Sequence, residues 1–94
     1  MLADESIARQ ARRAVRFRAR VQTSDFMPLS RRDPVRFEAA ERAWAQAYAQ
    51  AGIGITDLSF AEVHDCFTIA ELMIYEAMGL TEPGQGHIAI DEGW

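Results

Sequence analysis

Hydrophobic and polar residues follow two different spacings in the first quarter of the chain. From Asp4 to Arg13 the apolar residues fall on one side of a helix, and Asp4 is a suitable N-cap for it. From Ala14 to Gln22 the period changes to two, so that successive side chains point to opposite faces. The apolar set is Val15, Phe17, Ala19 and Val21, and the polar set is Arg16, Arg18, Arg20 and Gln22. The pattern predicts a short helix followed by a half-buried strand.

A longer amphipathic helix is predicted from Asp33 to Ala51. Asp33 can accept hydrogen bonds from the first free amides, and Pro34 at the first helical position gives up no hydrogen bond. Gly52 supplies a left-handed stop. Apolar residues recur at steps of three and four, at Phe37, Ala40, Trp44, Ala47, Tyr48 and Ala51. The preceding segment, Thr23 to Arg32, is rich in turn-forming residues and is predicted to be a loop.

The second half of the chain is predicted to hold a buried strand, a helix and a final extended piece. Residues 53–58 turn the chain into a short strand over Ser59 to Val63. A helix then runs from Asp65 to Gly79 and is apolar nearly all round, so we expect other parts of the protein to cover it. A Pro/Gly turn follows over Thr81 to Gly86, and His87 to Asp91 is predicted to be extended.

Two caps are available to this second helix. Asp65 can cap it, and Thr68 with Glu71 has the spacing of a capping box. The order helix, strand, helix, strand, helix is typical of an α/β layer structure. We therefore predict an α/β fold, a mixed sheet with covering helices, in one domain of residues 1–94.

Composition and charge narrow the functional classes. The single cysteine excludes an internal disulfide, and no segment near Met1 has the apolar core of a signal peptide or membrane span, so we expect a cytoplasmic protein. All ten basic residues are arginines, and all lie at or before Arg42. Residues 1–42 also hold six acids and have a net charge of +4, whereas residues 43–94 hold eight acids and have a net charge of −8. The arginines are spread over several predicted elements without a known binding pattern, so we expect no nucleic-acid partner.

Candidate chemistry gathers at His64, Asp65 and Cys66, where the second predicted strand meets the second long helix. Functional residues of α/β sheets lie at such junctions. His64 can stabilise an oxyanion, act as a base, bind a metal or be a structural histidine. Cys66 in a first helical turn can be a nucleophile, although cysteine is also often buried. We expect no metal site, because adjacent side chains on a strand diverge and no further ligand pair has suitable spacing.

The run from His64 to Glu71, His-Asp-Cys-Phe-Thr-Ile-Ala-Glu, resembles the carboxy-terminal half of thiolases of the sterol-carrier-protein and lipid-transfer type. The similarity extends to Ser30–Pro34, Ala47–Gly52, Tyr75–Leu80, Pro83–Gly86 and Asp91–Gly93. It implies a partial thiolase carboxy-terminal domain, with Ala14–Gln22 as its first strand. In that family a cysteine of the amino-terminal domain is acylated from acyl-CoA, and 3-ketoacyl-CoA is formed or cleaved.

The resemblance assigns His64 to the catalytic site, where it polarises the thioester carbonyl and stabilises an enolate oxygen. It places Phe67 beside the substrate and gives Cys66 no nucleophilic role. It implies no cofactor, with a coenzyme A thioester as substrate. The nucleophile domain and the Gly-His-Pro segment of the family are expected to come from a complementary thiolase chain or a homo-oligomer. The alternatives are a noncatalytic module that docks on a complete thiolase and a truncated remnant.

Overall fold

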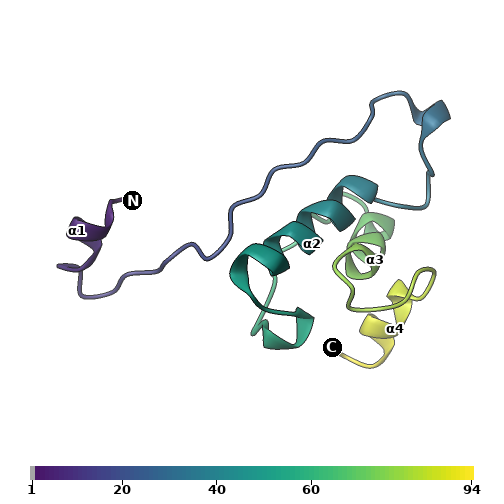
Figure 1. Cartoon of the computed structure of the whole chain (residues 1–94). Helices are drawn as coiled ribbons and strands as arrows, with labels where there is room; N and C mark the ends of the chain where they lie inside the picture. The colour runs from purple at the N-terminus through teal and green to yellow at the C-terminus, as the bar shows by residue number, and fades with distance from the viewer. Residues whose placement is uncertain (1) are drawn as a thin grey trace.

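A computed structural model describes residues 2–94, and its α-helices are α1 (Glu5–Ala8), α2 (Glu38–Ala51), α3 (Thr68–Ala77) and α4 (Gly86–Asp91). Two 3-10 turns, η1 (Leu29–Arg31) and η2 (Ile55–Asp57), lie in the connections. Helix α3 contacts both α2 and α4, and the chain between α1 and α2 passes alongside α2 on its way from α1 (Figure 1). The Tyr48 hydroxyl on α2 donates to the carbonyl of Met78 after α3, at 2.9 Å, which ties the two longest helices together.

The predicted α/β fold with a mixed sheet is wrong, because residues 2–94 contain no β-strand. The predicted strands over residues 14–22 and 59–63 make no backbone hydrogen bonds to each other or to another described segment. An alternating pattern defines the faces of a strand, but the strand also needs a neighbour for its backbone N–H and C=O groups. The described part of the chain brings no such neighbour to either segment.

We call residues 14–24 the arm, and its second part, residues 18–24, lies along α2. The Arg18 guanidinium donates to the Ala51 carbonyl at the end of α2, and the Thr23 hydroxyl donates to the Ala39 carbonyl at its beginning, at 2.7 Å. The arm therefore runs antiparallel to the helix. An extended chain covers the length of α2 with few residues, because it rises about 3.3 Å per residue against 1.5 Å in a helix.

The apolar face predicted for α2 is confirmed, since all six of its residues are half-buried. Gly52 ends the helix as predicted, with a φ of 65°. The start was predicted too early: Phe37 occupies the N-cap position, and the Asp33 carboxylate accepts from the amide of Val35, at 3.0 Å, in a turn. The Asp33 carboxylate thus makes a hydrogen bond of the capping kind within a turn, and no helix begins there.

The two shortest helices also differ from prediction. Asp4 caps α1 by accepting from Ile7, but the helix ends after one turn instead of reaching Arg13. Over His87–Asp91, where we predicted an extended piece, the chain forms α4. Ala89 is among its buried residues, so packing against α3 stabilises helix in a segment that is too short for a reliable pattern of its own.

The described chain is much more open than an independent domain of its size. Its accessible surface is 7887 Å², whereas a compact monomer of 10.6 kDa exposes about 5,500 Å². Its radius of gyration is 16.0 Å, against about 12 Å for a compact chain of this length. The buried hydrophobic residues are Ala70, Ala77, Met78 and Ala89, and thirteen large apolar side chains are more than half exposed. Every helix in the described range is too short or too polar to cross a bilayer.

We expect the free 94-residue chain to self-associate or to bind a hydrophobic dye such as ANS, because contiguous exposed apolar surface is unfavourable in water. Light scattering and dye fluorescence measure this directly. A monodisperse monomer without dye binding, and with a radius of gyration near 12 Å by small-angle scattering, would contradict the expectation and point to a self-sufficient compact fold.

Candidate functional site

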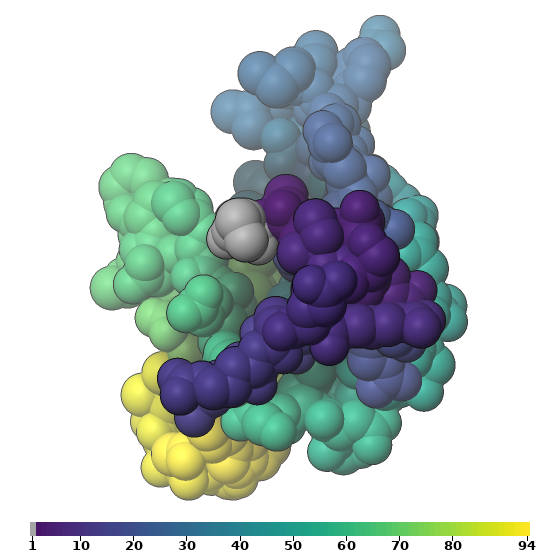
Figure 2. Space-filling view, turned by 90° about the vertical axis from the view of Figure 1, so that its left-hand side faces the viewer, coloured from purple at the N-terminus to yellow at the C-terminus, as the bar shows by residue number. Residues whose placement is uncertain are grey.

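The predicted catalytic residue His64 lies on the loop between η2 and α3. His64, Asp65 and Cys66 are all exposed, and the green lobe of Figure 2 that contains this part of the chain projects from the surface. Within residues 2–94 the His64 side chain makes no hydrogen bond or ion pair. The loop therefore presents the imidazole outward, without a neighbour that fixes its orientation.

Phe67 stands at the N-cap position of α3 and its side chain is 73% exposed. Neither predicted cap is formed: the helix begins at Thr68, and no side chain caps it. The Glu71 carboxylate instead accepts from the Tyr75 hydroxyl, and this hydrogen bond raises the pKa of Tyr75 above its ordinary value. The first turn of α3, with Phe67 beside it, is thus open to a further element.

The structure changes the case for Cys66 as a nucleophile. Cys66 is an exposed free cysteine that precedes α3 instead of lying in its first turn, so it lacks the helical position on which that interpretation rested. No hydrogen bond joins it to His64 among the described residues. Within residues 2–94, no three His, Cys, Asp or Glu side chains lie close enough together to hold a metal ion.

A separate cavity of 610 Å³ lies between the segment before α2 and helices α3 and α4. Its lining is mostly apolar, and the Glu76 carboxylate on its wall accepts from the Gly86 amide at 2.9 Å. Neither His64 nor Phe67 reaches it, whereas Ile69 at the start of α3 does. Sequence reasoning missed this cavity, because it depends on α4, where an extended piece was predicted.

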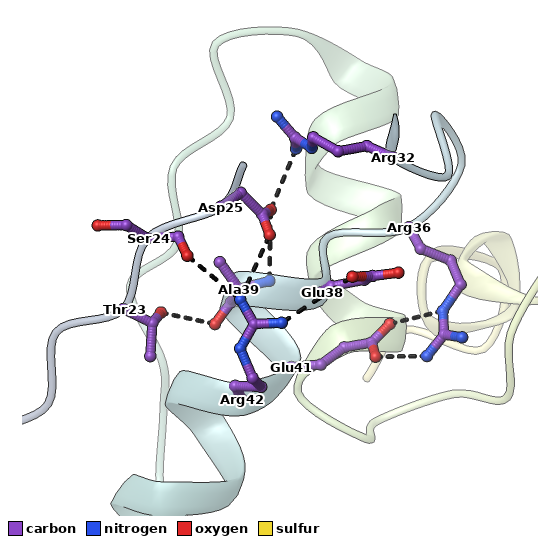
Figure 3. Close-up of polar contacts among 9 residues, drawn as sticks. All are labelled: Thr23, Ser24, Asp25, Arg32, Arg36, Glu38, Ala39, Glu41 and Arg42. Carbon is purple, nitrogen blue, oxygen red and sulfur yellow. Dashed lines mark hydrogen bonds and ion pairs between the residues drawn. The ribbon is translucent and has the colours of Figure 1, made fainter. Parts of the chain in front are cut away.

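Sequence reasoning also missed a polar cluster that fixes the end of the arm to α2 (Figure 3). The Asp25 carboxylate accepts from Arg32 at 3.1 Å, from Arg42 at 3.4 Å and from the Ala39 amide at 3.3 Å. Its side chain is 18% exposed, so this anchor is shielded from solvent. Asp25 lies in a predicted loop, where no periodicity marks it as an anchor.

Beside this cluster, Arg36 pairs with Glu41 through two guanidinium nitrogens. The hydrogen bond from Arg36 to Glu41 raises the pKa of Arg36 above its ordinary value. Arg32, Arg36 and Arg42 thus each bond to a carboxylate of the chain itself and have a structural role. In the arm, the Arg18 guanidinium donates to the Ala51 carbonyl and Arg16 approaches Glu5 at 3.7 Å.

Comparison with known proteins connects this arrangement to one family. Residues 19–94 match the family model described as thiolase C-terminal domain-like. The chain is 39% identical over 59 residues to sterol carrier protein 2 of Rattus norvegicus, covering 63% of this chain and 11% of that protein. It is 44% identical over 55 residues to benzoylsuccinyl-CoA thiolase subunit BbsB of Thauera aromatica, covering 58% of this chain and 14% of that protein.

A third relative matches over a longer segment. The chain is 39% identical over 77 residues to the acetyl-CoA acetyltransferase of Methanocaldococcus jannaschii, covering 80% of this chain and 20% of that protein. Across these relatives the chain spans between 11% and 20% of their length.

Proposed function

This chain belongs to the thiolase C-terminal domain-like family, and from that membership we propose that it forms part of a thiolase-type acyl-CoA acyltransferase. The observation that carries the proposal is the exposed loop at the start of α3. His64 and Phe67 lie three residues apart on this loop, within the segment that matches the family, and both are exposed in the described chain. A pocket around them requires a further protein surface.

In the proposed site His64 donates a hydrogen bond to the thioester oxygen of an acyl-CoA. As the adjacent carbon loses a proton, negative charge moves onto that oxygen, and a donor placed there stabilises the transition state more than the ground state. Coenzyme A leaves earlier, when the cysteine of the complementary sequence takes the acyl group from a first acyl-CoA. In the condensation the enolate carbon attacks that acyl group, so that a carbon–carbon bond forms, the acyl–cysteine C–S bond breaks and the cysteine thiol is regenerated. Phe67 covers the acyl part of the substrate, and the reaction needs no cofactor besides the thioester.

The acylated cysteine and the second histidine are supplied by complementary thiolase sequence, in another chain or another copy. The openness of the described chain supports this part of the proposal, because its accessible surface exceeds that of a compact monomer by about 2,400 Å². Stable protein interfaces bury about 1,200–2,000 Å² in total, and obligate ones more. The additional accessible surface of the chain is therefore about as large as the area that a permanent interface buries.

We expect the free chain to release no coenzyme A from acetyl-CoA or acetoacetyl-CoA, since one member of a catalytic group retains little activity without the others. A chimera provides the positive test. The 77-residue matching segment of the Methanocaldococcus jannaschii enzyme is replaced by the corresponding residues of this chain, and coenzyme A release is measured. The control is the unaltered archaeal enzyme, expressed and assayed in parallel.

An active chimera supports the catalytic proposal. A chimera that melts cooperatively but releases no coenzyme A would contradict it and favour the noncatalytic docking module. Release of coenzyme A by the free chain, abolished by Cys66→Ala, would overturn the proposal in another way, because the thiol would then be a nucleophile in its own right.

A further inference from the structure

The arm is held to α2 through side chains. Within residues 2–94, no backbone N–H or C=O of the arm bonds to another backbone group. Near the end of α2, the Arg18 guanidinium donates to the Ala51 carbonyl, and the Arg20 amide donates to the Gln50 side chain at 3.2 Å. Both hydrogen bonds are exposed, so water can replace them at little cost in free energy.

The apolar contact between the arm and α2 is also small. Ala19 and Val21 are half-buried, whereas Val15 and Phe17 earlier in the arm are 96% and 64% exposed. A shallow hollow of 270 Å³ remains beside Ala19 and Val21, and its other lining residues belong to α2, namely Ala40, Ala43, Trp44 and Ala47. Unfilled space forfeits dispersion contacts. The arm thus covers this face of α2 without packing closely on it.

The other end of the arm is fixed more firmly. The Thr23 hydroxyl donates to the Ala39 carbonyl at 2.7 Å, and the adjoining Asp25 carboxylate accepts from Arg32 and from the Ala39 amide (Figure 3). The Asp25 and Arg32 side chains are only 18% and 24% exposed, and charged hydrogen bonds are about twice as strong as neutral ones. The arm therefore has a weak end near Arg18 and a firm end at Asp25.

Helix α2 is held in place independently of the arm. It contacts α3, and the Tyr48 hydroxyl donates to the Met78 carbonyl at 2.9 Å. Trp44 lies one turn before Tyr48, and the centroids of the two rings are 5.6 Å apart. Removal of the arm would therefore uncover Trp44 on a helix that keeps its contact with α3.

We propose that the arm is a strap that opens about Asp25. Residues 14–22 leave α2 while Asp25 keeps its contacts, so that the apolar face around Trp44 becomes exposed and the helices stay folded. The freed residues regain conformational entropy, which offsets the loss of a few exposed hydrogen bonds and a small apolar contact. The opening does not depend on the proposed catalytic role, and its test uses no thioester.

Trp44 reports the opening once Trp94, the other tryptophan, is replaced in the full chain by Trp94→Phe. Acrylamide quenching of Trp44 fluorescence and helical circular dichroism are followed as urea is added, below the concentration at which light scattering detects association. We expect quenching to rise at urea concentrations that leave the helical signal unchanged, because opening exposes Trp44 without unfolding α2. Coincident transitions of the two signals would overturn the proposal.

Variants at the weak end provide the matched test. Arg18→Gln combined with Gln50→Ala removes both hydrogen bonds there and should raise the opening constant about tenfold, seen as stronger quenching of Trp44. Arg13→Gln combined with Gln10→Ala makes the same two exchanges of residue type before the arm and should leave quenching unchanged. Equal quenching in the two double variants would contradict the strap, and the urea experiment requires neither of them to fold.

The amide of Ala39 reports the hinge separately, because it donates to the Asp25 carboxylate at 3.3 Å. Its hydrogen exchange should stay slow when Arg18→Gln and Gln50→Ala open the arm, whereas Asp25→Ala should accelerate it about tenfold. Fast exchange of Ala39 in the double variant would mean that the whole segment detaches, and unchanged exchange in Asp25→Ala would mean that Asp25 is no anchor. Either result refutes a hinge at this residue.

Discussion

His64→Ala is expected to lower the turnover number of the reconstituted enzyme about 10²- to 10³-fold, which is the usual effect of removing one oxyanion donor. The melting temperature should change little. His64 is exposed and makes no hydrogen bond within residues 2–94, so its removal leaves no buried partner unsatisfied. Coenzyme A release by the archaeal chimera, normalised to its acylated active sites, and a thermal melt of the same preparation measure the two effects.

His87→Ala is the matched control, because His87 is the other histidine of the chain and is also exposed, on α4. It should leave normalised turnover unchanged. Wild-type turnover in His64→Ala would refute the catalytic role. A lowered melting temperature with normal turnover of the folded fraction would instead make His64 a packing residue at the interface with the complementary sequence.

Gly86→Ala is expected to destabilise the packing of α4 on α3 by about 1–3 kcal/mol or more. A Cβ at this position would lie 2.4 Å from the carbonyl oxygen of Leu72 and 2.9 Å from its carbonyl carbon. Both atoms belong to the backbone of α3, so the clash can be relieved only by moving α4. That movement also weakens the hydrogen bond from the Gly86 amide to Glu76. Urea unfolding and amide exchange of residues 86–92 measure the loss.

Gly54→Ala is the control for the general effect of replacing glycine. The nearest atom to a Cβ at Gly54 is an oxygen of the Asp57 carboxylate at 4.0 Å, and its φ of −118° suits any residue. We expect a change within about 0.5 kcal/mol. Equal destabilisation by both substitutions would mean that close approach of the two helices is not the reason for glycine at residue 86.

The parts of the fold that the sequence predicted depend on local interactions. The apolar face of α2 repeats over four turns, and Gly52 marks its end through its own backbone preference, so neither needs knowledge of distant residues. The end of α3 is similarly local, with Gly79 at a φ of 81° directly after the helix. Helix starts were predicted wrongly, because the Asp33 carboxylate accepts from Val35 in a turn and no side chain caps α3.

The sheet could not be predicted correctly because strand pairing is not local. Residues 14–22 have the alternation of a strand, but in the structure they form no ladder, and of their apolar residues only Ala19 and Val21 are half-buried, whereas Val15 and Phe17 are exposed. For the candidate site, the sequence identified the segment from His64 to Phe67, and the structure places it on an exposed loop instead of at the end of a strand. The Asp25 carboxylate is held by Arg32 and Arg42, which lie 7 and 17 residues further along the chain, and no short sequence pattern predicts such contacts.

The exposed arm also bears on the lifetime of the chain in a cell. Proteases cleave exposed, weakly held segments, and the arm carries basic cleavage positions at Arg16, Arg18 and Arg20. In the proposed assembly, complementary thiolase sequence that covers the arm would remove these positions from attack. We then expect chain made in excess of its partner to be degraded faster than assembled chain. The abundance of the partner would set the amount of chain that persists, without coordinated synthesis of the two.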